Sequence, residues 1–203
     1  MDLSFGPEYD DFRSDVVNFL NNNSDKAPKG GDLRGEQAKD WQKLLIENGY
    51  TCRTIPKEYG GFGAEPDIIK SRIIGEEFSK SRVNPGLGGQ GISMLVPTLL
   101  EMGTEEQKQK FIRPTIHGDM IWCQGYSEPG AGSDLASLTT AAVLDGDEWV
   151  VNGQKIWTST AHLADWIFCL VRSEPDAPKH KGISFLLFEM TTPGIEIRPL
   201  VDM

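Results

Sequence analysis

Cysteine and histidine are both scarce in this 203-residue chain, and each shortage argues against a class of protein. The three cysteines, Cys52, Cys123 and Cys169, are widely spaced and form no C-x-x-C pair, which argues against a disulfide framework or a zinc site. The three histidines form no ligand pair at helical spacing. The chain is therefore predicted to occupy a reducing, cytoplasmic compartment and to lack a structural metal.

A basic surface and a long apolar run are also missing. The formal net charge of -10 argues against a nucleic-acid partner, because phosphate binding needs a basic face. The longest uninterrupted apolar run, Trp166–Val171, is far shorter than the roughly 20 residues that span a bilayer. The first residues carry acids from Asp2 onward, so no secretory signal is predicted.

Apolar spacing in the first part of the chain is typical of helices. Phe12, Val16, Phe19 and Leu20 form one stripe, and Thr104 stands at capping-box spacing before the last helix. Gly49 is placed for a left-handed helix cap. Helices are predicted over residues 7–23, 36–48, 66–81 and 92–102, and from residue 104 onward.

After Gly118 the pattern changes to short runs rich in Val, Ile, Trp and Phe, with a hairpin signal at Asp145-Gly146-Asp147. Strands are predicted over residues 120–124, 139–144, 148–151, 165–172, 182–188 and 195–200. Helices followed by strands indicate an α+β protein. We expect an all-α helical bundle over residues 1–119 and an antiparallel β-barrel or sandwich domain over residues 120–203.

Two motifs carry the chemistry. Y-S-E-P-G-A-G-S-D, residues 126–134, is a glycine-rich loop that can turn several backbone N–H groups toward an anion. N-G-Q-K-I-W-T-S, residues 152–159, places Trp157 two positions before Ser159, where alternation along a strand would aim both at one face. Together they indicate a seat for a large planar cofactor that carries phosphate.

These paired motifs resemble the flavin-binding signature of the acyl-CoA dehydrogenase family. P-K-E-Y-G-G, residues 56–61, and M-G-T-E-E-Q-K-Q-K-F, residues 102–111, are similar to that family's N-terminal helical domain. The resemblance covers essentially the whole chain. It implies a helical domain followed by a middle β domain that binds FAD.

The resemblance implies roles for individual residues. Ser127 would bond the flavin ring, Ser159 would lie near flavin N5, Trp157 would pack beside the ring, and the Gly130–Ser133 turn would lie near the pyrophosphate. The residues implied to bind FAD are Gln124, Tyr126, Ser127, Gly132, Ser133, Trp157, Thr158 and Ser159. Those implied to contact the acyl-CoA are Ser133 and Gln90.

The implied reaction is removal of the α-proton and transfer of the β-hydrogen as hydride, which gives a trans-2-enoyl-CoA. Electron-transferring flavoprotein is the implied acceptor, in a homo- or hetero-oligomeric enzyme. The family's catalytic glutamate belongs to a C-terminal helical domain, and no residue here matches it. No catalytic base is therefore assigned, and the chain by itself is expected to be truncated, to retain flavin weakly and to be inactive.

Other interpretations remain open at this point. The scaffold could carry an acyl-CoA oxidase or a flavin monooxygenase, a noncatalytic subunit of a heteromeric dehydrogenase, or a remnant that binds nothing. Glu128 and Asp134 could form an acid/base pair, although bracing of the loop is favoured. Glu76-Glu77 is interpreted as a solvated face, and residues 179–181 as a solvated loop rather than a contact for a CoA phosphate.

Overall fold

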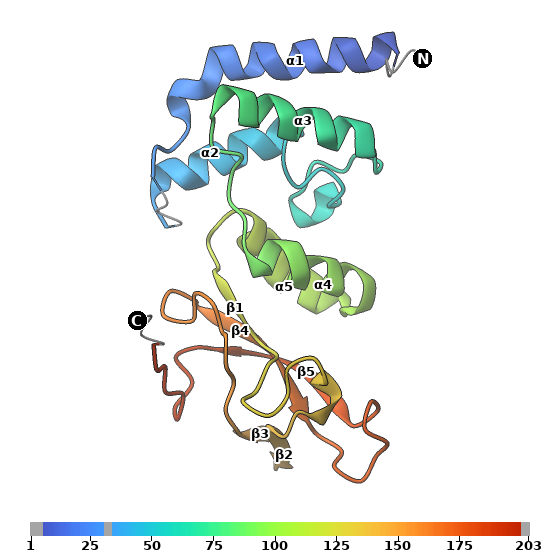
Figure 1. Ribbon diagram of the computed structural model, residues 1–203, viewed down its shortest axis with the longest axis vertical. Helices are drawn as coiled ribbons and strands as arrows, with labels where there is room; N and C mark the ends of the chain where they lie inside the picture. The colour runs from blue at the N-terminus through green and yellow to red at the C-terminus, as the bar shows by residue number, and fades with distance from the viewer. Residues whose placement is uncertain (1–5, 31–33, 200–203) are drawn as a thin grey trace. The chain divides into compact units, whose positions relative to one another are not determined.

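A computed structural model describes residues 6–30 and 34–199 of the chain. The chain divides into two compact units, Met1–Asp119 and Met120–Met203 (Figure 1). The first unit holds the helices and the second holds the strands. The predicted α+β class is therefore confirmed.

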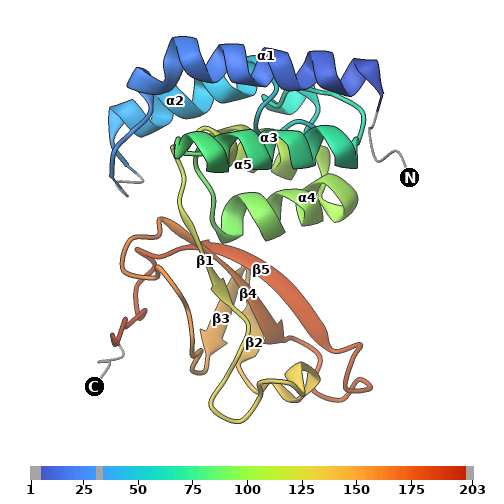
Figure 2. The same ribbon diagram turned by 45° about the horizontal axis from the view of Figure 1, so that its top comes forward.

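The described residues of the first unit form five α-helices, and α1 and α3 lie side by side in both views (Figures 1 and 2). No helix within the described ranges has the length and apolar character needed to cross a membrane. The helices are α1 (Pro7–Asn23), α2 (Glu36–Glu47), α3 (Ile68–Ser81), α4 (Val96–Met102) and α5 (Glu105–Ile116).

The predicted apolar stripe of α1 faces the core of this unit. Val16, Phe19 and Leu20 are buried against Trp41 of α2 and Phe78 of α3. Burying one such side chain contributes about 1.5–3 kcal/mol, so the stripe fixes which face of α1 packs inward. The core rather than intrinsic helix propensity holds these helices in place.

Local helix signals are confirmed at two sites. The Thr104 hydroxyl accepts from the N–H of Gln107 at 3.2 Å, while the Gln107 side chain accepts from the N–H of Thr104 at 2.9 Å. Gly49 follows α2 with φ of 72°, the left-handed conformation that glycine adopts without a steric penalty.

The fourth helix is not the continuous α-helix that was predicted over residues 92–102. Gly91–Leu95 forms a π-helical turn, and α4 begins only at Val96. Pro97 has no N–H and cannot complete a regular α-helical bond to Ser93, so the wider turn precedes it. Spacing of apolar residues does not register this change of helical type.

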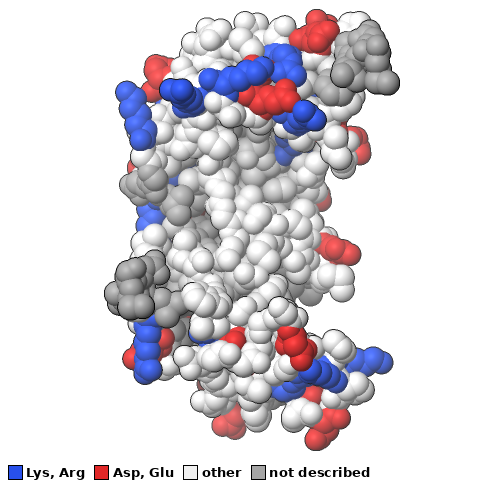
Figure 3. All heavy atoms as spheres, in the orientation of Figure 1, with Lys and Arg blue, Asp and Glu red and all other residues white. Residues whose placement is uncertain are grey.

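The interpretation of Glu76-Glu77 as a solvated face was wrong for Glu77. The Glu77 side chain is only 8% exposed and accepts hydrogen bonds from Arg13 of α1 and from Lys80 at 2.7 Å. The Lys80 and Arg13 contacts keep the pKa of this carboxyl below its ordinary value even though burial opposes them. Figure 3 shows that Lys and Arg side chains lie next to Asp and Glu side chains elsewhere on the surface too.

The second unit is built on one mixed sheet in which β4 is central. β4 pairs in parallel with β1 along its first half and with β2 at its last residue, and it pairs antiparallel with β5. The strands are β1 (Trp122–Gly125), β2 (Ala141–Asp145), β3 (Glu148–Asn152), β4 (Trp166–Arg172) and β5 (Ile183–Glu189).

Three details of the β prediction were wrong. The sheet is open rather than a closed barrel, and it is not purely antiparallel. Between β1 and β4 the chain makes a long excursion that contains both motifs, and a crossover of this length permits parallel pairing. Residues 195–199 form no strand, and Leu200, the end of that prediction, lies outside the described residues.

The apolar run of the sequence is explained by the central position of β4. Phe168, Cys169 and Val171 are at most 2% exposed, because neighbouring strands and side chains cover both faces. Burial raises the pKa of Cys169 to about 11 and that of Cys123 on β1 to about 12. These thiols are packing residues of the core and not reactive nucleophiles.

Candidate functional site

The two sequence motifs lie side by side in the second unit. The N–H of Ile156 donates to the carbonyl oxygen of Ser127 at 2.9 Å. The Lys155 ammonium donates to the carbonyl oxygen of Tyr126 at 3.1 Å. Segments 29 residues apart in sequence are therefore joined directly, backbone to backbone and side chain to backbone.

Glu128 lies at the centre of this junction, with its side chain only 4% exposed. One carboxylate oxygen accepts from the N–H and the hydroxyl of Thr139 at 2.7 and 2.8 Å. The other accepts from the N–H of Thr140 at 2.9 Å and from Lys155 at 2.9 Å. The Glu128 carboxylate therefore braces the loop, as favoured from the sequence. Both of its oxygens accept hydrogen bonds, two each.

This environment sets the charge of Glu128. Burial alone would raise its pKa, but the hydrogen bonds from Lys155 and from the Thr139–Thr140 segment lower it to about 2, against an ordinary value of 4.5. A lowered folded-state pKa stabilises the fold fully above about pH 4.5, and the contribution is lost as the pH falls toward 2.

Acidification should therefore weaken the fold through Glu128. We expect the free energy of unfolding to fall by about 3 kcal/mol from this group as the pH drops from 6 toward 2. Urea unfolding of the parent and of Glu128→Gln across this range measures it. The difference between the two proteins should shrink as the pH falls; a constant difference would contradict the assignment.

The glycine-rich segment forms a tight exposed turn after Glu128. Glu128 and Ala131 exchange two backbone hydrogen bonds of 3.0 Å across Pro129 and Gly130. A Cβ added at Gly130 or Gly132 would meet nothing within 4 Å, so open space adjoins this backbone. Gly132 and Ser133 are exposed, and the turn can approach a phosphate without side-chain obstruction.

The outer end of the loop is fastened by ion pairing. Asp134 accepts from Ser137 at 2.5 Å and from Lys179 at 2.6 Å, and these contacts lower its pKa. Arg172, at the end of β4, donates to the carbonyl oxygens of Ala136 and Lys179 at 2.6 and 2.7 Å. Residues 179–181 form an exposed loop, as predicted, and Lys179 is engaged by Asp134.

Trp157 does not lie on a strand, so the expectation of strand alternation was wrong. β3 ends at Asn152, and Trp157 has φ of 60°, a left-handed conformation that is costly for a bulky residue. The residue as a whole is 70% exposed. Ser159 is also exposed, Thr158 is half-buried, and the N–H of Ser159 donates to the Trp157 carbonyl at 2.9 Å.

Gln124 lies on β1, Tyr126 and Ser127 follow that strand, and all three residues are half-buried. The Tyr126 ring meets Phe168 of the core edge-on, with ring centres 5.8 Å apart, and burial raises the pKa of its hydroxyl. Gly125, the last residue of β1, packs closely against β4, because a Cβ added to it would lie 2.9 Å from Cys169 Sγ. A rigid strand end thus supports the first motif.

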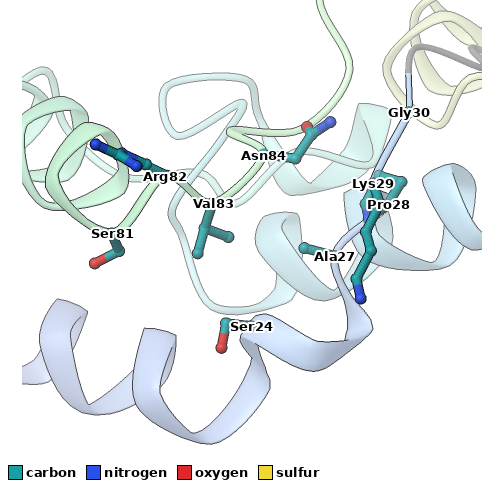
Figure 4. A pocket seen from close by; sticks show the side chains of 9 residues that line it. All are labelled: Ser24, Ala27, Pro28, Lys29, Gly30, Ser81, Arg82, Val83 and Asn84. Atoms are coloured by element: carbon teal, nitrogen blue, oxygen red, sulfur yellow. The ribbon is translucent and has the colours of Figure 1, made fainter.

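Gln90 belongs to the helical unit, where it precedes the π-helical turn and is half-buried. The same unit has a hollow of about 570 Å³ between the ends of α1 and α3 (Figure 4). Ala27 and Val83 turn toward each other there, while the Arg82 side chain points away. Ala27 and Val83 belong to the apolar cluster of this unit, so the hollow is a gap beside the core.

Sequence reasoning missed three residues of this site: Lys155, Arg172 and Gly153. Lys155 belongs to the second motif and Glu128 to the first. Their opposite charges were the signal that could have predicted the ion pair. Gly153 approaches Thr140 so closely that an added Cβ would lie 2.3 Å from its hydroxyl oxygen. Only the fold reveals that contact and the carbonyl partners of Arg172.

Comparisons with known proteins identify the family of this chain. Residues 6–119 match the acyl-CoA dehydrogenase N-terminal domain, and residues 123–203 match the acyl-CoA dehydrogenase middle domain. Acyl-CoA dehydrogenase IpdE1 of Mycobacterium tuberculosis is 43% identical over 83% of this chain and 43% of its own length. Acyl-CoA dehydrogenase FadE34 of the same organism is 49% identical over 80% of this chain and 22% of its own length.

A solved structure is also similar to this chain. A chain of the ChsE4–ChsE5 complex from Mycobacterium tuberculosis matches with a TM-score of 0.75 and 33% identity, over 100% of this chain and 52% of that chain. This chain thus spans about half or less of the length of these relatives. Acyl-CoA dehydrogenases are FAD-dependent flavoproteins. Both family models and both relatives place this chain in the acyl-CoA dehydrogenase family.

Proposed function

We propose that the complete protein is an FAD-dependent acyl-CoA dehydrogenase that converts an acyl-CoA thioester to a trans-2-enoyl-CoA. The observation that carries the proposal is the Ile156-to-Ser127 backbone hydrogen bond of 2.9 Å. It brings together the two segments that the family resemblance assigns to the flavin. Family membership supports acyl-CoA dehydrogenation in general, and the finer assignment is ours.

The residues present fit the proposed cofactor. Trp157 offers an exposed indole in a strained backbone conformation, which is typical of functional sites. The open turn at Gly130 and Gly132 leaves backbone free to approach a diphosphate. Gln124, Tyr126, Ser127, Ser133, Thr158 and Ser159 are proposed to complete the FAD site.

The chemistry divides between the cofactor and the protein. Bound FAD supplies the acceptor for the hydride that leaves the substrate β-carbon. The protein must hold the thioester, exclude water and remove the α-proton with a carboxylate within hydrogen-bond reach. Among the described residues, Glu128 is unsuited to that task because it is buried, ionised and engaged by several donors. We propose that the base comes from residues beyond these 203 or from a partner chain.

Substrate contacts are proposed for Ser133, toward the nucleotide part of the CoA, and for Gln90, toward the acyl chain. Electron-transferring flavoprotein is the proposed electron acceptor. The cytoplasmic location also remains a prediction.

The flavin site can be tested by replacing Trp157 and Ser159 with alanine in the complete protein. We expect the double variant to bind FAD about tenfold or more weakly, since it loses both an aromatic contact and a hydrogen bond. Titration calorimetry and the visible flavin spectrum measure this effect. Leu163→Ala, which removes another exposed apolar side chain of the unit, is the control. Unchanged affinity and spectrum in the double variant would remove these residues from the site.

A second candidate is a subunit of a heteromeric dehydrogenase. It is favoured by the solved relative described as a ChsE4–ChsE5 complex, which matches this chain over its whole length. Native mass spectrometry of the protein from its own source distinguishes the two candidates. A stoichiometric second polypeptide supports the subunit, and a homo-oligomer supports the single-chain enzyme. Reaction of the reduced protein with oxygen would instead favour an oxidase.

A further inference from the structure

The Lys155–Glu128 ion pair lies where the two motifs meet. Lys155 is one residue before Ile156 and two before Trp157, and Glu128 directly follows Ser127. The two side chains are only 10% and 4% exposed, and their charged atoms are 2.9 Å apart. The pair thus joins the first motif to the second at the residues that flank the proposed flavin contacts.

Lys155 makes a second contact that extends this link. Its ammonium donates to the Tyr126 carbonyl oxygen at 3.1 Å as well as to Glu128. The carbonyl oxygens of Tyr126 and Ser127 are therefore both held from the second motif, one by Lys155 and the other by Ile156 N–H. The N–H and hydroxyl of Thr139 hold the other carboxylate oxygen of Glu128, while the N–H of Thr140 shares the oxygen that Lys155 contacts.

Alternative uses of these charges do not fit the geometry. The carboxylate has donors on both oxygens and is nearly inaccessible, so it is poorly placed to take a proton from a substrate. The ammonium already contacts two oxygens and is also buried, which leaves it little access to a phosphate. A buried pair is weak evidence for stability, since apolar replacements are often equally stable, but it can specify one geometry.

We propose that Lys155 and Glu128 are positioning residues that fix the separation between Ser127 and the Trp157–Ser159 segment. This inference rests on the proposed flavin site and assigns the pair a role in that site. Loss of the ammonium allows the second motif to shift away from Tyr126, and the flavin-contacting side chains then lose their preset arrangement.

The test uses the full-length protein with three substitutions. Lys155→Met keeps the apolar stem of the side chain and removes the ammonium. The double variant, Lys155→Met with Glu128→Gln, leaves neither charge buried, so a folded protein is available even if the single variant unfolds. Glu77→Gln is the matched control, since Glu77 is also a buried carboxylate in ion pairs but belongs to the helical unit. Each protein is measured for its unfolding midpoint, FAD affinity and flavin reduction potential.

The double variant should recover much of the unfolding midpoint yet bind FAD about tenfold more weakly than the parent, with a shifted reduction potential. In flavin-free protein, exchange of the Ile156 amide hydrogen should become about tenfold faster, because its bond to Ser127 opens more often. Glu77→Gln should lower the unfolding midpoint and leave the affinity, potential and Ile156 exchange unchanged.

Two results overturn the inference in distinguishable ways. If the parent binds FAD and the double variant matches its affinity, potential and Ile156 exchange, the pair is structural only and the proposed function stands. If the complete parent protein binds no FAD, the proposed function fails and the positioning role fails with it.

Discussion

The Glu128→Gln substitution is expected to lower the free energy of unfolding by about 3–5 kcal/mol. This is the cost of leaving the buried charge of Lys155 without its charged partner. The amide keeps the size of the side chain, so the effect does not come from a cavity. Lys155 would retain its ammonium with neutral acceptors at most beside it, the Tyr126 carbonyl oxygen and the glutamine amide oxygen. The amide nitrogen would also face an N–H donor of the Thr139–Thr140 segment.

Urea unfolding followed by tryptophan fluorescence is the direct measurement, since four of the five tryptophans, at positions 122, 149, 157 and 166, belong to the second unit. Asp134→Asn is the control. Asp134 and Lys179 are 64% and 49% exposed, and a solvated pair of this kind contributes about 1 kcal/mol or less. Equal losses in the two variants would show that burial around Glu128 has been misjudged.

The Gly153→Ala substitution should give the second large effect. We expect it to lower the free energy of unfolding by about 1–3 kcal/mol or more through overpacking. The added Cβ would lie 2.3 Å from the Thr140 hydroxyl oxygen and 2.6 Å from the Thr140 Cα, and a backbone atom cannot rotate away. Thr140 N–H is a donor to Glu128, so the shift would also disturb the Glu128 contacts and, on our proposal, FAD binding.

Gly130→Ala is the matched control for this prediction. It adds the same methyl group to a glycine of the other motif, where nothing lies within 4 Å, and its φ is not in the left-handed region. Both variants are compared by the same urea unfolding measurement. Finding Gly153→Ala as stable as Gly130→Ala would contradict the close approach of residue 153 to Thr140.

Much of the fold followed from local patterns. The stripe of Val16, Phe19 and Leu20 predicted the buried face of α1, and the capping box at Thr104 predicted the start of α5. These signals lie within a few residues of the structure they specify. Sheet pairing was less accessible, since parallel or antiparallel pairing of β4 depends on the path of distant segments.

The candidate site divides in the same way. The motif residues, Ser127 and Trp157 among them, were named from the sequence through a family resemblance, and their roles toward FAD stay predictions. The strand assigned to Trp157 was wrong because alternation assumes extended backbone, whereas its φ is 60°. The Lys155 contact to Glu128 was missed because 27 residues separate the two side chains in sequence.

The sequence by itself determined the α+β class, the faces of the helices and the two segments that carry the family signature. Tertiary structure alone decided that those segments touch, that Glu128 is ionised in a buried setting, and that Trp157 stands exposed. The physical reason is the separation in sequence between the interacting residues. Helix caps and apolar stripes depend on residues only a few positions apart. Desolvation and hydrogen bonding at a junction depend on which distant groups the fold places there.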